Sequence, residues 1–73
     1  YGRCVDAARE AVRLRPTYEL AWNNLASCLS PQGRWDEAIL AAGEALKLRP
    51  DFTLARNNLR HATSMKAKAL SAA

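Results

Sequence analysis

Two pairs of adjacent asparagines are the residues of this sequence best suited to bind another molecule. The pair Asn23-Asn24 returns 34 positions later as Asn57-Asn58, and a leucine follows each pair. An asparagine side chain has two donor hydrogens and one acceptor oxygen, so it can bond both polar groups of a peptide backbone. Asparagine is also a poor residue inside a helix, because its amide competes for backbone groups. The pairs therefore predict peptide binding; the alternative is that one asparagine of each pair bonds a neighbouring helix or is solvated.

The other reactive side chains form no catalytic or metal-binding pattern. The sequence has one histidine, His61, and two cysteines, Cys4 and Cys28. No acidic or basic residue stands near them at a spacing typical of a catalytic nucleophile with its base. The three glycines form no phosphate-binding loop. A zinc site would need two ligands in addition to the two cysteines, and His61 is far from them in the sequence. We therefore predict no catalytic residue, no metal and no cofactor. We expect both cysteines to be buried and reduced, although they could form a disulfide if the fold brings them together.

The 34-residue spacing extends well beyond the asparagines. Leu14-Arg15-Pro16 repeats as Leu48-Arg49-Pro50, and Leu20-Ala21 repeats as Leu54-Ala55. A fixed period of this length is typical of stacked repeats, in which one unit cannot bury its apolar face alone. Apolar residues recur at spacings of three and four, which is the pattern of helices with one buried face. The predicted helices span about residues 3–15, 18–30, 35–48 and 53–70.

The pattern within one period resembles the tetratricopeptide repeat, whose consensus places Trp, Leu, Gly, Tyr, Ala, Phe and Pro at set positions. Ala26, Leu29 and Ala42 depart from it, at the Gly, Tyr and Phe positions. The resemblance implies an all-α fold, a fragment of an alpha-alpha superhelix or solenoid with four antiparallel helices. The matching residues are Trp22, Leu25, Ala38, Ala45 and Pro50, together with the turn at 33–38.

The repeat divides the chain into three expected parts. Residues 1–16 would be the second helix of an incomplete repeat, residues 17–52 a complete repeat, and residues 53–73 a C-terminal capping helix. Arg60 stands where Ala26 stands one repeat earlier. Because a small residue at this position lets the paired helix approach, we expect no further helix to pack against the last segment.

Composition and charge exclude several classes of protein. No apolar run approaches the roughly 20 residues that a membrane span needs. The net charge is +4, and residues 1–52 are neutral with seven basic and seven acidic side chains, so the excess lies in residues 53–73. A nucleic-acid-binding protein more often has a basic stripe along a groove, with aromatic residues among the charges. We therefore expect no membrane and no nucleic acid as partner, and, without a visible signal peptide, a cytoplasmic location.

The resemblance implies a protein–protein interaction module rather than an enzyme. In this family, the first helices of successive repeats line a concave groove that holds an extended peptide, and here these are helices 18–30 and 53–70. Asn24 and Asn58 are also similar to the asparagine ladder in the arrays of the O-linked N-acetylglucosamine transferases. The predicted peptide-binding residues are Leu20, Asn23, Asn24, Ser27, Leu54, Asn57, Asn58 and His61.

Two alternative functions remain open at this stage. The chain could be a structural scaffold that self-associates through its open N-terminal end, forming a homodimer through helix 1–15. It could also be the substrate-recruiting arm of a larger transferase. The first alternative depends on an apolar stripe that we expect to face solvent, formed by Cys4, Ala8, Ala11 and Val12.

Overall fold

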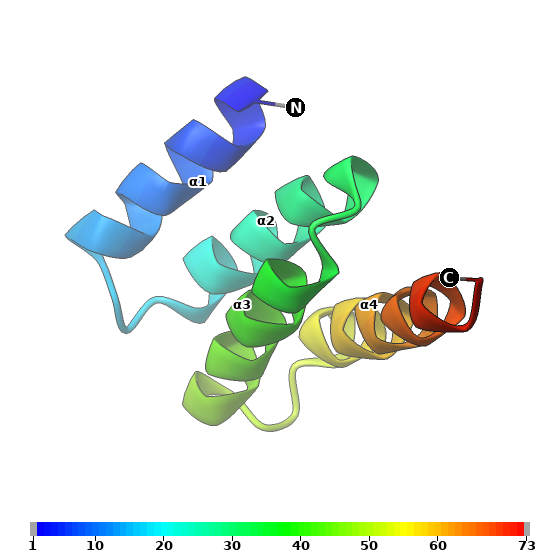
Figure 1. Cartoon of the computed structure of the whole chain (residues 1–73). Coiled ribbons are helices and arrows are strands. Elements are labelled where there is room, and N and C mark those ends of the chain that lie inside the picture. Colours follow the sequence, from blue (N-terminus) through cyan, green and yellow to red (C-terminus); the bar gives the residue numbers. More distant parts are fainter. Residues whose placement is uncertain (1, 73) are drawn as a thin grey trace.

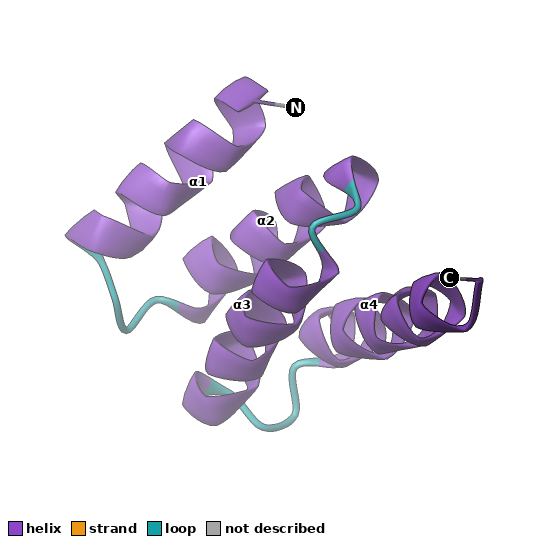
Figure 2. Cartoon of the chain, in the orientation of Figure 1, coloured by secondary structure: helices purple, strands orange, loops and turns teal. Residues whose placement is uncertain are grey.

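The structure, a computed structural model, describes residues 2–72, and these form helices without any strand (Figures 1 and 2). The helices alternate in direction and form a thin array with dimensions of about 37 × 28 × 13 Å. Helix α2 packs against α1, α3 and α4, and α3 also packs against α4 (Figure 1). The predicted all-α architecture of four antiparallel helices is confirmed. The elements are α1 (Gly2–Leu14), α2 (Glu19–Leu29), the short 3-10 helix η1 (Ser30–Gln32), α3 (Trp35–Leu48) and α4 (Thr53–Ala72).

Proline and glycine set the ends of these helices. Pro16 and Pro50 each follow a helix by two residues, where proline cannot donate a backbone hydrogen bond and disfavours a helical residue before it. Directly after α2 the chain tightens into η1, and Pro31 is the second residue of this short helix. Gly33 then takes the left-handed conformation, with φ of +70°, which glycine adopts without a steric penalty. These residues turn the chain so that α3 returns along α2.

The turn that precedes α2 is repeated before α4. The indole Nε1 of Trp22 donates a hydrogen bond to the carbonyl oxygen of Pro16 at 2.8 Å, and 34 residues later Nη2 of Arg56 donates to that of Pro50 at 2.8 Å. Different side chains thus make the same contact, so the 34-residue period is a property of the structure as well as of the sequence. A cation–π contact recurs in both turns, between Arg15 and Tyr18 and between Arg49 and Phe52.

Small residues dominate the core. Ala26 on α2 and Ala62 on α4 are both fully buried, and Leu29 is the largest side chain with less than 2% of its surface exposed. Alanine lets the helices approach closely, because its side chain occupies little space between their backbones. Helix α3 presents four alanines to its neighbours, each 2% exposed or less: Ala38, Ala41, Ala42 and Ala45.

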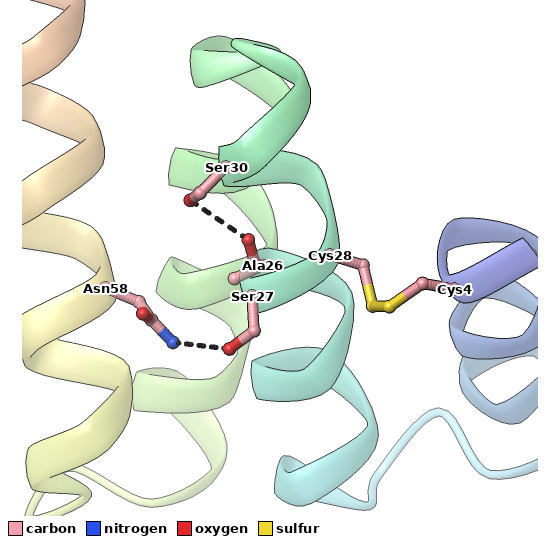
Figure 3. Close-up of a disulfide and its surroundings, with 6 residues drawn as sticks. All are labelled: Cys4, Ala26, Ser27, Cys28, Ser30 and Asn58. Carbon is pink, nitrogen blue, oxygen red and sulfur yellow. Dashed lines mark hydrogen bonds between the residues drawn. A yellow bond between two sulfur atoms is a disulfide. The ribbon is translucent and has the colours of Figure 1, made fainter. Parts of the chain in front are cut away.

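Cys4 and Cys28 form a disulfide that joins α1 to α2 (Figure 3), so the expectation that both are reduced is wrong. Their Cα atoms lie 5.6 Å apart, within the range that a disulfide spans. Cys28 is buried, but Cys4 is exposed. The sequence could not place the two together, because 24 positions separate them and the packing of α1 on α2 decides their distance. Disulfides persist mainly in oxidising compartments, so the bond gives no support to a cytoplasmic location.

Ion pairs lie on the surface of the array. Arg9 of α1 pairs with Glu37 of α3 at 2.5 Å, and Lys66 of α4 pairs with Asp36 of α3 at 2.5 Å. Within α1, the hydrogen bond from Arg13 lowers the pKa of the Glu10 carboxyl. All these side chains are well exposed, so each pair contributes little to stability.

Candidate partner-binding surfaces

Adjacent residues of α2 project toward different neighbouring helices. Ser27 points toward α4, where its Oγ accepts a hydrogen bond from Asn58 Nδ2 at 3.1 Å, whereas Cys28 points toward α1 (Figure 3). This follows from the helix itself, because consecutive residues are rotated by about 100°. Two surfaces result, which we name the α2/α4 face and the α1/α2 groove.

The α2/α4 face consists of predicted site residues at helical spacings of three and four. At its centre, Nδ2 of Asn58 donates to Oδ1 of Asn23 at 2.7 Å as well as to Ser27. Asn23 is only 6% exposed and is the one buried polar residue among residues 2–71. One asparagine of each pair therefore bonds a neighbouring helix, which was the alternative stated for the asparagines. The residues of the α2/α4 face are Leu20, Asn23, Ser27, Leu54, Asn57, Asn58 and His61.

The rest of the α2/α4 face is open to solvent. Leu54 is 60% exposed and Leu20 is 37% exposed, although both are apolar. Asn57 and His61 are exposed as well. The imidazole of His61 lies edge-on against the ring of Trp35, with the ring centroids 5.8 Å apart. The face thus combines two exposed leucines, one repeat apart, with polar groups that can donate and accept hydrogen bonds.

Asn24 is the predicted site residue that the structure places elsewhere. It is exposed and lines the α1/α2 groove, a hollow of about 470 Å³ whose wall includes the disulfide. A second hollow of about 280 Å³ continues the groove past Leu14, Tyr18 and Ala21. The prediction from the asparagine pattern did not include the α1 side of this groove. The first hollow is lined by Cys4, Ala7, Ala8, Ala11, Asn24, Ser27 and Cys28.

Neither surface has the residues of a metal site. Within residues 2–72, no three side chains of the metal-ligating types gather closely enough to hold an ion. In the same part of the chain, no helix has both the length and the apolar character that a bilayer crossing requires. The chemistry that these surfaces offer is apolar contact and hydrogen bonding.

Comparison with protein families gives a match to a repeat family. Residues 7–40 match the model of the tetratricopeptide repeat, over slightly less than half of the chain. The matched segment covers most of α1, all of α2 and the first part of α3. Comparison with curated proteins and with solved structures finds no match. The similarity of Asn24 and Asn58 to the ladder of the O-linked N-acetylglucosamine transferases therefore rests on the sequence pattern alone.

The match and the four-helix array agree with each other. The array fits a fragment of a helical repeat, its residues 7–40 match the tetratricopeptide repeat, and repeats of that type generally serve as protein–protein interaction modules. Stacked repeats of this kind present extended surfaces, which they use to bind other proteins.

Proposed function

We propose that this chain is a non-catalytic interaction module that binds an extended segment of a partner protein along the α2/α4 face. The observation that carries the proposal is the pair of exposed leucines, Leu20 and Leu54, on neighbouring helices one repeat apart. A fully buried leucine contributes about 1.5–3 kcal/mol. Covering both leucines would therefore supply much of the free energy of binding.

The polar groups around the leucines suit a peptide backbone. Asn57 is exposed and offers both a donor and an acceptor. Asn58 uses its amide nitrogen within the protein, which leaves its Oδ1 as an acceptor for a backbone N–H group. Asn24 would reach such a peptide only at the edge of the face, beside α1. Because these contacts address the backbone, the module would accept peptides of different sequence.

A selection from a displayed library of 12-residue peptides tests this proposal. The selected peptides are then titrated against the wild-type chain and two leucine variants, Leu54→Ala and Leu40→Ala. Leu40 is the matched control, because it is 69% exposed but lies on α3, outside the face. We expect Leu54→Ala to weaken binding about tenfold or more, with no change for Leu40→Ala. Equal affinities for the wild type and both variants would contradict the proposed location.

Self-association through α1 is the second candidate function. Fewer apolar residues of α1 are free to make this contact than we expect from the sequence. Of the expected apolar stripe, Ala8 is buried, Val12 is half-buried against the core, and Cys4 is engaged in the disulfide. What favours this candidate is Leu14, which is 63% exposed at the end of α1. Light scattering over a range of protein concentrations tests it, because a homodimer would raise the apparent mass with concentration.

A further inference from the structure

A shift of 34 residues relates α1 to α3 and α2 to the first part of α4. The α1/α2 groove therefore corresponds to the groove between α3 and α4, and α2 packs in that second groove. Each of the three alanines of the α1/α2 groove is again an alanine 34 residues later. The later alanines are 2% exposed or less, because α2 and α4 cover them. In the α1/α2 groove, by contrast, Ala7 is exposed and Ala11 is only half-buried. The pairs are Ala7 and Ala41, Ala8 and Ala42, and Ala11 and Ala45.

The other positions of the groove show the same difference. Tyr18 is 41% exposed, whereas its counterpart Phe52 is 5% exposed. Asn24 is exposed, whereas its counterpart Asn58 is half-buried and donates two hydrogen bonds to α2. The α1/α2 groove therefore has the residues of a helix-binding groove, and no helix of residues 2–72 occupies it.

We propose that the α1/α2 groove binds an amphipathic α-helix of a partner protein, in the place that α2 takes against α3 and α4. Asn24 donates its side-chain amide to this helix, as Asn58 does to α2. This inference goes beyond the proposed function and does not rest on it, because a chain that binds no extended peptide on the α2/α4 face can still hold a helix here.

The contacts of α2 define the chemistry of the partner helix. Trp22 packs against the cluster of Ala45, Phe52 and Ala55, so the partner helix needs an aromatic residue at the first position. Ala26 is fully buried, so an alanine is required four residues after the aromatic. Hydrogen-bond acceptors are required one and five residues after the aromatic, at the positions that Asn23 and Ser27 take in α2.

A second copy of this chain does not supply such a helix. The side of its α2 that carries Trp22 and Ala26 is already packed within the array, so of the two helices that begin a repeat, α2 and α4, only α4 leaves the corresponding side exposed. In α4, the counterparts of Trp22 and Ala26 are Arg56 and Arg60. An arginine at the position of Ala26 would have to bury its charge between two helices, which is strongly unfavourable without a partner.

A synthetic peptide of residues 16–32 with Cys28→Ala is the probe, because it reproduces the helix that packs against α3 and α4. It is titrated into the full chain while the alanine methyl signals are followed by NMR. We expect saturable shifts of the Ala7 and Ala11 methyl signals. Shifts confined to Ala41, Ala42 and Ala45 would show that the peptide has replaced α2 instead, and they would overturn the proposal.

A double-mutant cycle tests the role of Asn24. Asn24→Ala in the protein and Asn23→Ala in the peptide should each weaken binding up to about tenfold. Once one of these changes is present, the other should have little further effect, because both remove the same hydrogen bond. Asn57→Ala, which removes an exposed amide from the α2/α4 face, is the matched control and should leave the affinity for the peptide unchanged.

Two further outcomes would overturn the proposal. The first is additive effects of the two asparagine changes, which would show that they make no contact. The second is equal binding of a peptide with Ala26→Arg, which would show that the alanine groove is not the binding site. Loss of binding with Asn57→Ala, together with unchanged binding by Asn24→Ala, would place the peptide on the α2/α4 face and would also contradict it.

Discussion

Asn58 of α4 donates its side-chain amide to Oδ1 of Asn23 in α2 at a distance of 2.7 Å. Asn23 is buried, and a buried amide oxygen without a partner costs about 1–3 kcal/mol. The same nitrogen of Asn58 also donates to the hydroxyl of Ser27. The bonds fix how α4 lies along α2, because sliding either helix by one residue would break them. The polar contact therefore connects successive repeats, beside the alanine core.

Asn24 and Asn58 take equivalent positions in the 34-residue period, but their substitution by alanine should change stability to different extents. Asn58→Ala removes both hydrogen bonds and leaves Asn23 without its partner, so we expect the free energy of unfolding to fall by about 1–3 kcal/mol. Asn24→Ala changes an exposed side chain and should stay within about 0.5 kcal/mol of the wild type. Urea unfolding monitored by circular dichroism measures both. Equal losses in the two variants would show that the bond between Asn58 and Asn23 does not contribute.

The sequence predicts the helices closely, because the signals that define them are local. The helix predicted at residues 35–48 is α3 at Trp35–Leu48, and the one predicted at 53–70 is α4 at Thr53–Ala72. Proline and glycine mark the ends, and the spacing of apolar residues marks the buried sides. Neither signal requires knowledge of how the helices pack.

The surfaces are less predictable, because they depend on how α2 is rotated between its neighbours. Asn23 and Asn24 have the same side chain and adjacent positions, but one is buried against α4 and the other is exposed beside α1. The disulfide between Cys4 and Cys28 depends on the same packing. Both features can be derived only when the 34-residue shift is applied to contacts in the structure. The shift relates Cys4 to Ala38 and Cys28 to Ala62, and both alanines lie in the main core.

Reduction of the disulfide should destabilise the chain. The bond joins residues 24 positions apart, and a crosslink over a loop of this size stabilises a fold by about 2–4 kcal/mol. We therefore expect a lower midpoint of thermal unfolding when a reductant is present. The control is the double variant Cys4→Ala with Cys28→Ala, whose midpoint should not respond to reductant. If thiol titration finds two free thiols in protein purified without reductant, the crosslink is not formed in solution.

Alanine substitutions at two glycines should have opposite effects. Gly33 has φ of +70°, a conformation that costs other residues about 1–2 kcal/mol, so Gly33→Ala should be destabilising by that amount. The new side chain itself has room, since its nearest contact would be Trp35 Nε1 at 3.9 Å. Gly43 lies inside α3, where an added methyl group would meet no neighbouring side chain or helix within 4 Å, so Gly43→Ala should be stabilising by about 0.5–1 kcal/mol. Chemical denaturation of both variants checks the signs, and a neutral Gly33→Ala would contradict the left-handed turn.

The two halves of α4 should contribute unequally to stability. The first half covers the core with the fully buried Ala55 and Ala62, whereas residues 67–71 are all exposed. A domain of this size has a stability of only about 3–5 kcal/mol, and each large buried side chain contributes about 1.5–3 kcal/mol. Removal of residues 53–73 also exposes alanines of α3 that α4 covers, so we expect this truncated chain to show no cooperative thermal transition.

A shorter truncation is the matched control. Removal of residues 67–73 keeps Ala55, Ala62 and the ion pair between Lys66 and Asp36, and should shift the free energy of unfolding by no more than about 0.5 kcal/mol. Circular dichroism melts of both truncated chains give the comparison. A sharp transition after removal of residues 53–73 would show that α1, α2 and α3 fold without the cover that α4 provides. A large loss after the shorter truncation would show instead that the exposed end of α4 makes contacts in solution beyond the pair of Lys66 with Asp36.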